Sequence, residues 1–483
     1  MMYNINRNKN KLSGLDEQYA SGKKIQRPSE DPIIAVRALK LRTNLSELNQ
    51  YYEKNIPDAM SWMDVTESAL TNINDILTKV NTYCVQGTSD PLTVSDRTSI
   101  IQNLEEFKKQ IYQEGNSNYA GRYVFSGYKT DTSLIFNDAS NNLDYSITEK
   151  FSGSDMEAIS KVTGDHQLSQ YVPATSTAAT FANSPTLNET HRIRLSYDNL
   201  TTPPTSITYT EAGVATLQTL PVTSISVTAA GAYVPVAGTI NFIPETGELI
   251  MADADYEKLR LAEDISVTYG KNEFKEGDLR PENYFNCVVK DTDKPTRAPI
   301  TYTKSDQQIQ YEINFNQKLT INTQGSDALQ HGIGRDIDEI LEAVQDVAAT
   351  EKKIAEVTKL LNGATVTPAQ TAALTALQEQ LNTELILKNK IAHDKFEQGI
   401  TGTAKHQDTL NVAVADLGSR YVRLELTESR LSTQQVDFED LLSKNEDADM
   451  VDTIIRYNSA ESIYNASLSA ASKVVKNTLM DFL

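Results

Sequence analysis

Apolar side chains recur at alternating spacings of four and three residues along the C-terminal part of the chain. One ladder runs from Leu410 to Leu442, and its only polar rungs are Glu428 and Gln435. After a charged break at 443–449, a second ladder continues through Met450, Ile454, Tyr457, Tyr464, Leu468, Ala471, Val475 and Phe482. This spacing places side chains on one helical face, and its persistence is typical of helices that pack on other helices. An ordinary helical bundle inside a globular domain would give the same pattern.

A shorter ladder of the same kind opens the chain. It consists of Ile5, Leu12, Leu15 and Tyr19, with Asn8 as its polar rung, and Gly22 is placed to end the helix. Residues 21–32 have the composition of a turn, in which Asp31 and Pro32 suit the start of the next helix. Further helices are predicted over 34–52, 70–84 and 100–111. We expect a break or kink at Pro57, because proline has no amide donor.

The period of the pattern changes between about 122 and 323. There the chain is rich in Thr, Ser, Asn, Pro and β-branched residues, and short strands are predicted at 193–197, 207–210, 223–228, 239–243, 248–251, 265–269 and 308–323. The last of these is the clearest, as one half-buried strand or a hairpin. Helical patterns resume after Gly334 and lead back into the C-terminal ladder.

The predicted fold is therefore a multidomain α+β protein. A long antiparallel helical bundle or coiled coil is formed by both chain ends, and a β-rich domain is inserted between them. Because the β block is threaded into helices, the two flanking halves must pack together as one unit.

Composition limits the class of protein. The 483 residues suffice for about three domains. Mean hydropathy is -0.42, and no apolar run approaches the ~20 residues of a membrane helix, so we expect no membrane contact. Residues 1–11 lack the apolar core of a signal peptide. The two cysteines lie far apart, which excludes a disulfide framework.

Charge is unevenly distributed. The net charge of -20 argues against nucleic acid as a partner. Residues 1–42 hold nine Lys or Arg against four acids, whereas 425–452 hold nine acids against Arg430 and Lys444. These segments are either two solvated faces or two ends that attract each other or a neighbour's ends.

Candidate chemistry is sparse. The five histidines show no metal-ligand spacing, and His393 and His406 are expected at exposed helical positions. Cys84 and Trp62 are expected to be core packing residues. No phosphate-binding glycine loop and no nucleophile–base set can be named, so we predict no enzyme, no cofactor and no metal site.

Six segments carry recognisable sequence motifs, at 20–32, 37–42, 61–70, 121–127, 423–431 and 469–483. The motif residues are Ser21, Gly22, Lys23, Arg27, Pro28, Ser29, Asp31, Pro32, Arg122, Tyr123, Phe125 and Gly127. These segments resemble the flagellin superfamily, and in particular its hook–filament junction proteins. Three features depart from the family pattern: Pro57, an N-terminus that starts a few residues late, and a longer helical stretch at 350–402.

The resemblance implies a structural axial protein with nested domains. Terminal coils at 1–30 with 447–483 would form an inner layer. A helical bundle of 31–128 with 327–446 would follow, with 350–402 as a helical hairpin extension, and 129–326 would be the outer β-rich domain. The expected assembly contacts are Leu12, Leu15, Tyr19, Ile454, Tyr457, Tyr464, Leu468, Ala471, Val475 and Phe482.

The resemblance also implies partners and a location. Such proteins leave the cell unfolded through the flagellar export channel and form a ring of identical subunits in the extracellular flagellum. The ring joins the other hook–filament junction protein to flagellin. A cytoplasmic export chaperone would hold the C-terminal helix before assembly.

Two alternatives stay open. The chain could be a flagellin, although flagellins usually lack a proline at position 28 and commonly carry Gln-Ala-Asn-Gln in the terminal helix, where 459–466 reads Ser-Ala-Glu-Ser-Ile-Tyr-Asn-Ala. Alternatively, exposed edges of the β insert could bind a further partner, as in an adhesin.

Overall fold

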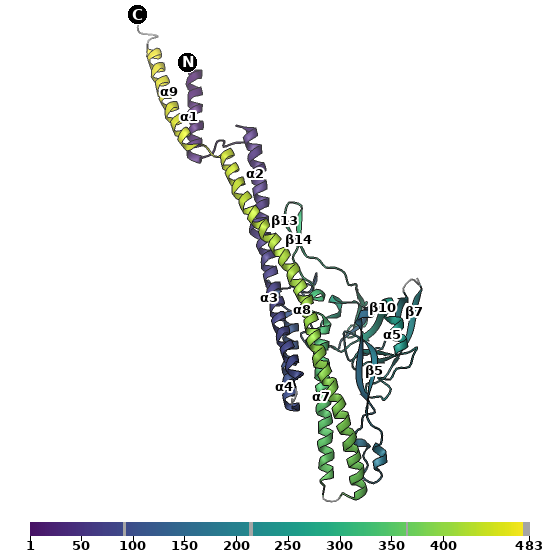
Figure 1. Cartoon of the computed structure of the whole chain (residues 1–483). Helices are drawn as coiled ribbons and strands as arrows, with labels where there is room; N and C mark the ends of the chain where they lie inside the picture. Colours follow the sequence, from purple (N-terminus) through teal and green to yellow (C-terminus); the bar gives the residue numbers. More distant parts are fainter. Residues whose placement is uncertain (90–92, 212–215, 364–365, 477–483) are drawn as a thin grey trace, which may run out of the picture. The chain divides into compact units, whose positions relative to one another are not determined.

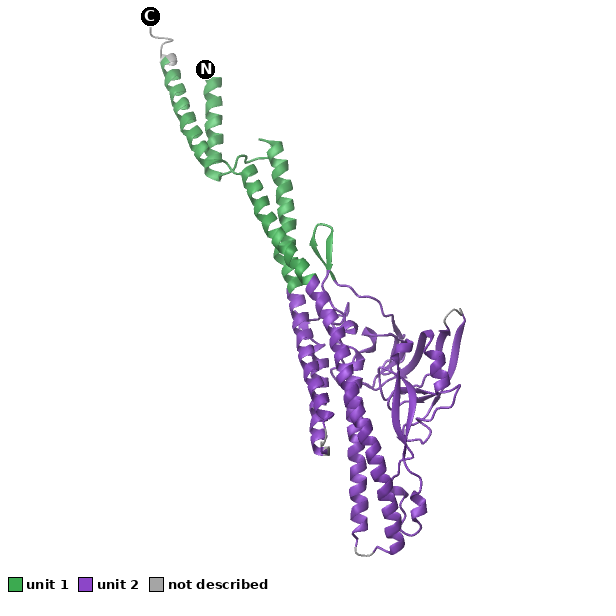
Figure 2. Cartoon of the chain, in the orientation of Figure 1, with its two compact units in different colours: residues 1–60, 310–319, 420–483 green, residues 61–309, 320–419 purple. Residues whose placement is uncertain are grey.

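The computed structural model describes residues 1–89, 93–211, 216–363 and 366–476. The chain divides into two compact units (Figure 2). Unit 1 comprises Met1–Met60, Gln310–Leu319 and Arg420–Leu483, and unit 2 comprises Ser61–Ile309 and Thr320–Ser419. Helices at both chain ends and a large β sheet between them confirm the predicted α+β class (Figure 1).

Unit 1 is built on α1 (Met2–Ser21), α2 (Pro32–Gln50), the last part of α8 (Pro368–Glu446) and α9 (Met450–Lys476). The predicted end signals are confirmed. Gly22 adopts φ 69°, and its amide donates to the Gln18 carbonyl at 2.9 Å. The Asp31 carboxylate accepts from the first free amides of α2, and Pro32 occupies the first helical position, where no donor is needed.

The chain continues through Pro57 in helical form, so the expected break is wrong. A single π-helical segment, η1 (Tyr51–Asn55), separates α2 from α3 (Ile56–Gly87). There the Ile56 amide donates to the Tyr51 carbonyl, five residues back. A wider turn directly before a proline relieves the clash of its ring with the preceding turn.

A small hairpin completes unit 1. It is formed by β13 (Gln310–Asn314) and β14 (Gln317–Thr320), which confirms the hairpin alternative for 308–323. Asn55 donates to the Glu312 carbonyl at 2.8 Å, and the Tyr311 hydroxyl bonds the Asp58 carboxylate. Phe315 does not join the inward face as its alternation predicted, because it lies at the turn and is 74% exposed.

Helices α3, α4 (Val94–Glu114), α6 (Gly325–Ala328), α7 (His331–Leu361) and α8 supply the helical part of unit 2. The predicted stripe of Leu70, Ile73, Leu77, Val80 and Cys84 is buried. Burial raises the pKa of the Cys84 thiol to about 12, so it stays protonated and serves as a core residue, as predicted. Helices α7 and α8 lie side by side as an antiparallel hairpin (Figure 1).

The β part of unit 2 is a ten-stranded sheet in the order β12-β11-β3-β10-β6-β7-β8-β9-β5-β4. Only β7 and β8 are recorded as a parallel pair among the described pairings. The strands are β3 (Leu143–Phe151), β4 (Met156–Thr163), β5 (Thr186–Arg194), β6 (Ser206–Glu211), β7 (Leu217–Ser224), β8 (Ile240–Ile243), β9 (Glu248–Met251), β10 (Ala262–Lys271), β11 (Asn286–Asp291) and β12 (Ile300–Tyr302).

Smaller elements complete unit 2. They are β1 (Asn118–Tyr119), β2 (Arg122–Tyr123), helix α5 (Asp253–Leu259) and the 3-10 turns η2 (Gly153–Asp155), η3 (Leu168–Gln170), η4 (Ala178–Phe181) and η5 (Pro281–Asn283). The sequence pattern did not predict β1, β2, β3, β4, β11 or β12. In β3 the inward face includes Glu149, which interrupts the apolar alternation on which the prediction depends.

Glu149 is a buried carboxyl group of the sheet. It accepts from the Tyr269 hydroxyl and from the Ser196 amide and hydroxyl, at 3.1 and 3.0 Å for the two Ser196 groups. Desolvation outweighs these donors and the nearby Arg335 cation, and it raises the pKa of Glu149 to about 7. In the unfolded chain the same group titrates at its ordinary, lower pKa.

The buried Glu149 makes the stability of the sheet depend on pH. Because its pKa is higher in the folded state, its contribution is greatest below the unfolded pKa and is lost as pH rises through about 7. Between pH 5 and 8 the free energy of unfolding of the wild type should fall by an amount on the order of 2 kcal/mol because of Glu149. In Glu149→Gln this fall should be absent. Urea unfolding of wild type and variant at both pH values measures it. Parallel pH profiles for the two proteins would contradict this assignment.

Candidate functional site: the paired chain ends

Helices α1 and α9 pack against each other in unit 1. Ile5 and Leu15 are buried on α1, and Thr453 and Ala460 are buried on α9. Asn8, the predicted polar rung, donates from its side chain to the Ser467 hydroxyl at 3.0 Å. The rings of Tyr19 and Tyr457 stack with centroids 6.4 Å apart. The two ends of the chain therefore form one helical pair.

The turn after α1 and the turn before α9 lie next to each other and form a crossing between the two chain segments. Lys23 and Asp447 form a β-bridge between the turn after α1 and the turn before α9. The Lys24 amide donates to the Glu446 carbonyl at 2.7 Å, and the Ala448 amide donates to the Gly22 carbonyl at 2.8 Å. Gly22 and Lys24, the two neighbours of the motif residue Lys23, thus hold the two turns together by backbone hydrogen bonds.

Ion pairs reinforce this crossing. Lys23 Nζ lies 2.5 Å from Asp447 and 3.5 Å from Glu446, and Arg42 lies 2.6 Å from Glu446, whose side chain is 8% exposed. The bond from Lys23 lowers the pKa of Asp447, and the same bond raises the pKa of Lys23. Attraction between the basic N-terminal segment and the acidic C-terminal segment is therefore confirmed within one chain.

Removing the Glu446 charge tests the crossing. We expect Glu446→Gln to cost about 1 kcal/mol or less, because both cations are well solvated. Faster hydrogen exchange should appear in α1 and α9 and leave the sheet unchanged. The stabilisation that the Lys23–Asp447 ion pair gives to the crossing is present at neutral pH. It is lost as pH falls through the lowered pKa of Asp447. Equal exchange in Glu446→Gln and in the exposed control Glu439→Gln would argue against this role.

Apolar side chains of unit 1 also face outward. On α9, Ile455 is 63% and Ile463 52% exposed. Both line a groove of about 240 Å3 beside α1, together with Asn8, Lys11, Arg456, Ser459 and Ala460. The other exposed apolar residues of unit 1 helices include Ile33, Val36, Leu39, Val436, Leu441, Met450, Val451, Ile454 and Leu468. The groove residues Ile455 and Ile463 are the exposed apolar side chains that lie together in a concave surface, which favours a contact there.

The predicted contact residues divide into three groups. Leu15 is buried, and Leu12, Tyr457, Tyr464 and Ala471 are half-buried. Tyr19, Ile454 and Leu468 are exposed. The side chain of Val475 and the whole of Phe482 lie outside the described residues.

The predicted apolar ladder contains only half of the α9 residues at the interface between α1 and α9. The residues of α9 nearest to burial are Thr453, Ala460 and Ser467, seven apart, interleaved with Tyr457, Tyr464 and Ala471. Thr, Ala and Ser give no apolar signal, so the prediction followed their bulkier neighbours. A search for small residues at heptad spacing would have found them.

The remaining motif residues have structural roles. The Arg122 guanidinium lies 5.0 Å from the Trp62 ring centroid, a cation–π contact, and Trp62 is buried as predicted.

The backbone carbonyl of the buried Phe125 accepts a hydrogen bond from the Gly325 amide at 2.9 Å. Gly127 has φ 58°, and a Cβ there would meet the Gln307 side chain at 2.2 Å. Tyr123 is half-buried, and Arg27, Pro28 and Ser29 are exposed in the turn after α1.

The histidine expectations are half right. His406 is buried rather than exposed, because its Nε2 lies 2.8 Å from the Asp336 carboxylate.

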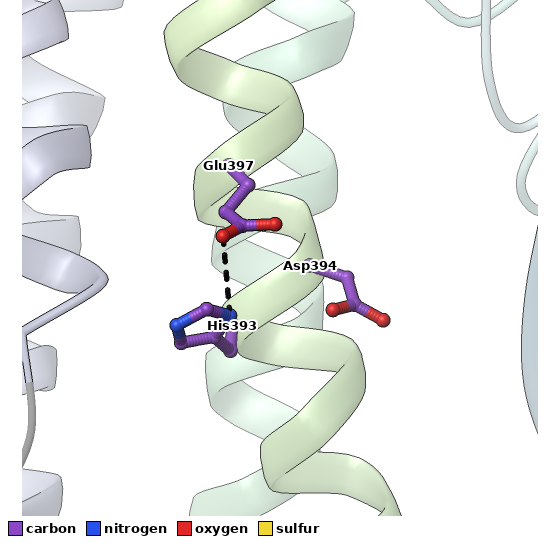
Figure 3. Close-up of side chains that lie close together, drawn as sticks. All are labelled: His393, Asp394 and Glu397. Atoms are coloured by element: carbon purple, nitrogen blue, oxygen red, sulfur yellow. Dashed lines mark ion pairs between the residues drawn. The ribbon is translucent and has the colours of Figure 1, made fainter.

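His393 lies on the surface of α8 near Glu397, with the His393 Nδ1 and the Glu397 Oε1 3.9 Å apart (Figure 3). Asp394 completes a loose group within 4.8 Å, although its carboxylate points away from Glu397. Zinc needs nitrogen and oxygen ligands ~2.0–2.2 Å away, so the group as it stands is too wide for a zinc ion.

Comparison with known proteins adds the decisive observation. Residues 1–130 match the bacterial flagellin N-terminal helical region. This part of the chain is therefore similar in sequence to the N-terminal region of flagellins. It contains the turn after α1, α2, α3, α4 and the Arg122 segment, which are the elements that carry the motif residues.

Among curated relatives, flagellar hook-associated protein 3 of Salmonella typhimurium is 30% identical over 118 residues, and that of Escherichia coli is 29% identical over 117. Each match covers 24% of this chain and 37% of the relative. A flagellin of Clostridium tyrobutyricum is 30% identical over 114 residues, covering 24% of this chain and 30% of its own. The chain therefore matches about a third of these relatives' length.

Solved structures give a weaker likeness. A flagellar hook-associated protein-3 from Legionella pneumophila aligns with 84% of this chain and 97% of its own, at 11% identity and TM-score 0.29. The Xanthomonas campestris protein FlgL aligns with 84% of this chain and 99% of its own, at 14% identity and TM-score 0.30.

Proposed function

We propose that the protein is a structural subunit of the bacterial flagellar axis. The observation that carries the proposal is the coincidence of two features in one segment. The flagellin-type region at 1–130 supplies α1 and α2, and the helices of the same unit present outward-facing apolar side chains. Such side chains lose water-exposed apolar surface when copies pack together.

Within the axis, we place the protein at the junction between hook and filament. The proposed layers are an inner coil of 1–30 with 447–483, a bundle of 31–128 with 327–446, a hairpin extension at 350–402 and an outer block at 129–326. Identical subunits would form a ring that contacts the other hook–filament junction protein on one side and flagellin on the other. The role needs no cofactor and no catalysis.

The proposed role also requires that the chain is exported from the cell. The chain would leave through the flagellar export apparatus, with an export chaperone on α9 beforehand. The groove lined by Ile455 and Ile463 is a suitable face for it. Among the described helices, none combines the length and hydropathy that crossing a membrane requires.

Electron microscopy of cells lacking this protein tests the junction role. We expect hooks without filaments, and flagellin shed into the medium. A second candidate, the filament subunit itself, is favoured by the match to a flagellin over the same region. Abundance separates the two, because a filament subunit dominates sheared filaments and a junction protein is a trace component. Normal filaments on mutant cells would refute both roles.

A further inference from the structure

The β part of unit 2 contacts helix α7 at three successive levels. At the first level, the His331 ring at the start of α7 lies among aromatic rings of the β part, with centroids 4.8 Å from Tyr197, 4.6 Å from Tyr284 and 5.3 Å from Phe285. These contacts are apolar and do not depend on an exact charge geometry.

The level farthest along the hairpin is also mainly apolar. The segment 164–185 runs between β4 and β5 and covers the far end of α7 and α8. Its Phe181 packs in a cluster with Val357 and Leu377, and Leu168 and Tyr171 pack against the same cluster. Lys353 adds one bond from its Nζ to the His166 carbonyl at 3.1 Å.

The contact between these two levels is made by charged side chains. Glu339 of α7 lies at its centre and accepts from three cations, Arg192 at 2.5 Å, Arg194 at 2.6 Å and Lys395 at 2.7 Å. Arg194 also binds Asp336 at 2.6 Å. We name this set, Arg192, Arg194, Asp336, Glu339 and Lys395, the ionic clasp. Its arginines join strand β5 to α7, and Lys395 joins α8 to the same carboxylate of α7.

The clasp is buried but borders an open space. Arg192 is 3% exposed, and a cleft of about 660 Å3 beside it is lined by residues of the clasp, by Glu149 and by Gln398. The neighbouring cations hold the pKa of Glu339 well below its usual range, so the carboxylate is ionised. If the two surfaces shift, Glu339 loses both arginines, and a buried charge that loses its partners is unfavourable. Arg192 then keeps Glu157 and Glu248 of the sheet as partners.

Each side of the clasp has a core of its own. The sheet encloses Ile147, Ile193, Phe242, Leu249 and Val267, all buried. The hairpin has Ala343 and Val347 of α7 packed with Ala392 of α8. Loss of the clasp therefore removes no residue from either core.

We propose that the ionic clasp is a releasable lock that sets the orientation of the β sheet on the α7–α8 hairpin. With the clasp broken, the sheet stays folded and tethered by the His331 rings and the 164–185 segment. The bond from Arg335 to the Thr246 carbonyl and the Lys161–Glu342 pair also remain. The sheet then turns relative to the hairpin, and water from the cleft solvates the separated charges. The inference does not depend on the proposed flagellar role.

Distance measurement across the clasp tests the lock. Spin labels are placed on Val236→Cys in the β part and on Ile386→Cys in α8, both exposed positions. The native Cys84 and Cys287 are buried, and burial raises the pKa of each thiol to about 12, so both escape labelling in the folded chain. Pulsed electron resonance then compares wild type with Glu339→Gln, and with Glu356→Gln as an exposed α7 control.

We expect one narrow distance in wild type and in Glu356→Gln, and loss of that single distance in Glu339→Gln. Hydrogen exchange of the sheet should be the same in all three. Asp336→Asn provides a second test from the helical side, because it weakens the other contact that Arg194 makes with α7, at 2.6 Å, and it should broaden the distance as well. A narrow wild-type distance in both Glu339→Gln and Asp336→Asn overturns the proposal. Loss of sheet protection in both also overturns it, because the charges would then be part of the fold.

Discussion

Cells whose only copy of the protein carries Ile455→Asp with Ile463→Asp are expected to build no attached filaments and to lose swimming. Both side chains are exposed in the folded chain, at 63% and 52%. The monomer should therefore keep its stability to within about 0.5 kcal/mol. In an assembled ring the same positions would be covered, and burying an unpaired carboxylate costs several kcal/mol.

A matched control is available on the same helix. Asn458→Asp with Asn465→Asp adds the same two charges to α9 at exposed polar positions. This variant should assemble, which separates an effect of apolar contact from an effect of net charge. Thermal unfolding of both purified variants shows that neither has lost its fold. Attached filaments in the Ile455→Asp, Ile463→Asp strain would exclude this face of α9 as an assembly surface.

Phe181→Ala is expected to have the largest effect on local stability. Phe181 is 1% exposed and joins the 164–185 segment to the far end of the α7–α8 hairpin. Removing a buried aromatic side chain costs ~3–5 kcal/mol, as lost burial plus the cavity left behind. That exceeds what short 3-10 turns supply by themselves, so the segment should detach from the helices.

Limited proteolysis and hydrogen exchange measure the detachment. New cleavage should fall within 164–185, and exchange should rise in α7 and α8 around Val357 and Leu377, with the sheet core unchanged. Val172→Ala in the same segment is the control, because Val172 is 47% exposed and should have little effect. A protease pattern identical to wild type in Phe181→Ala would show that other contacts hold the segment.

The candidate site was predicted unevenly by the sequence. The ladder from 410 to 431 was right, since Leu410, Leu417, Leu424 and Leu431 are all buried. On α9 the ladder identified a helix correctly but only part of the face that meets α1, namely Tyr457, Tyr464 and Ala471. Thr453, Ala460 and Ser467 occupy that face because close approach of two helices needs small side chains, which a hydrophobic pattern does not register.

Buried charge was the other feature beyond sequence reasoning. Arg192, Arg194 and Glu339 resemble solvated residues in any linear pattern, because strands and helices usually expose such groups. Their burial requires that β5 and α7, far apart in the chain, come together with opposite charges aligned. The same applies to His406, whose partner Asp336 lies on a different helix.

The sequence by itself determined the local and periodic features of this protein: the helices and their caps at Gly22 and Asp31, the change of period at the β block, and the resemblance carried by the Ser21–Pro32 and Arg122–Gly127 residues. These depend on neighbours within a few positions along the chain. The tertiary structure alone decided the sheet order, the face on which α1 and α9 meet, the crossing at Lys23 and Glu446, and the clasp around Glu339. Each of these is a contact between distant segments, whose free energy exists only once folding has brought the partners together.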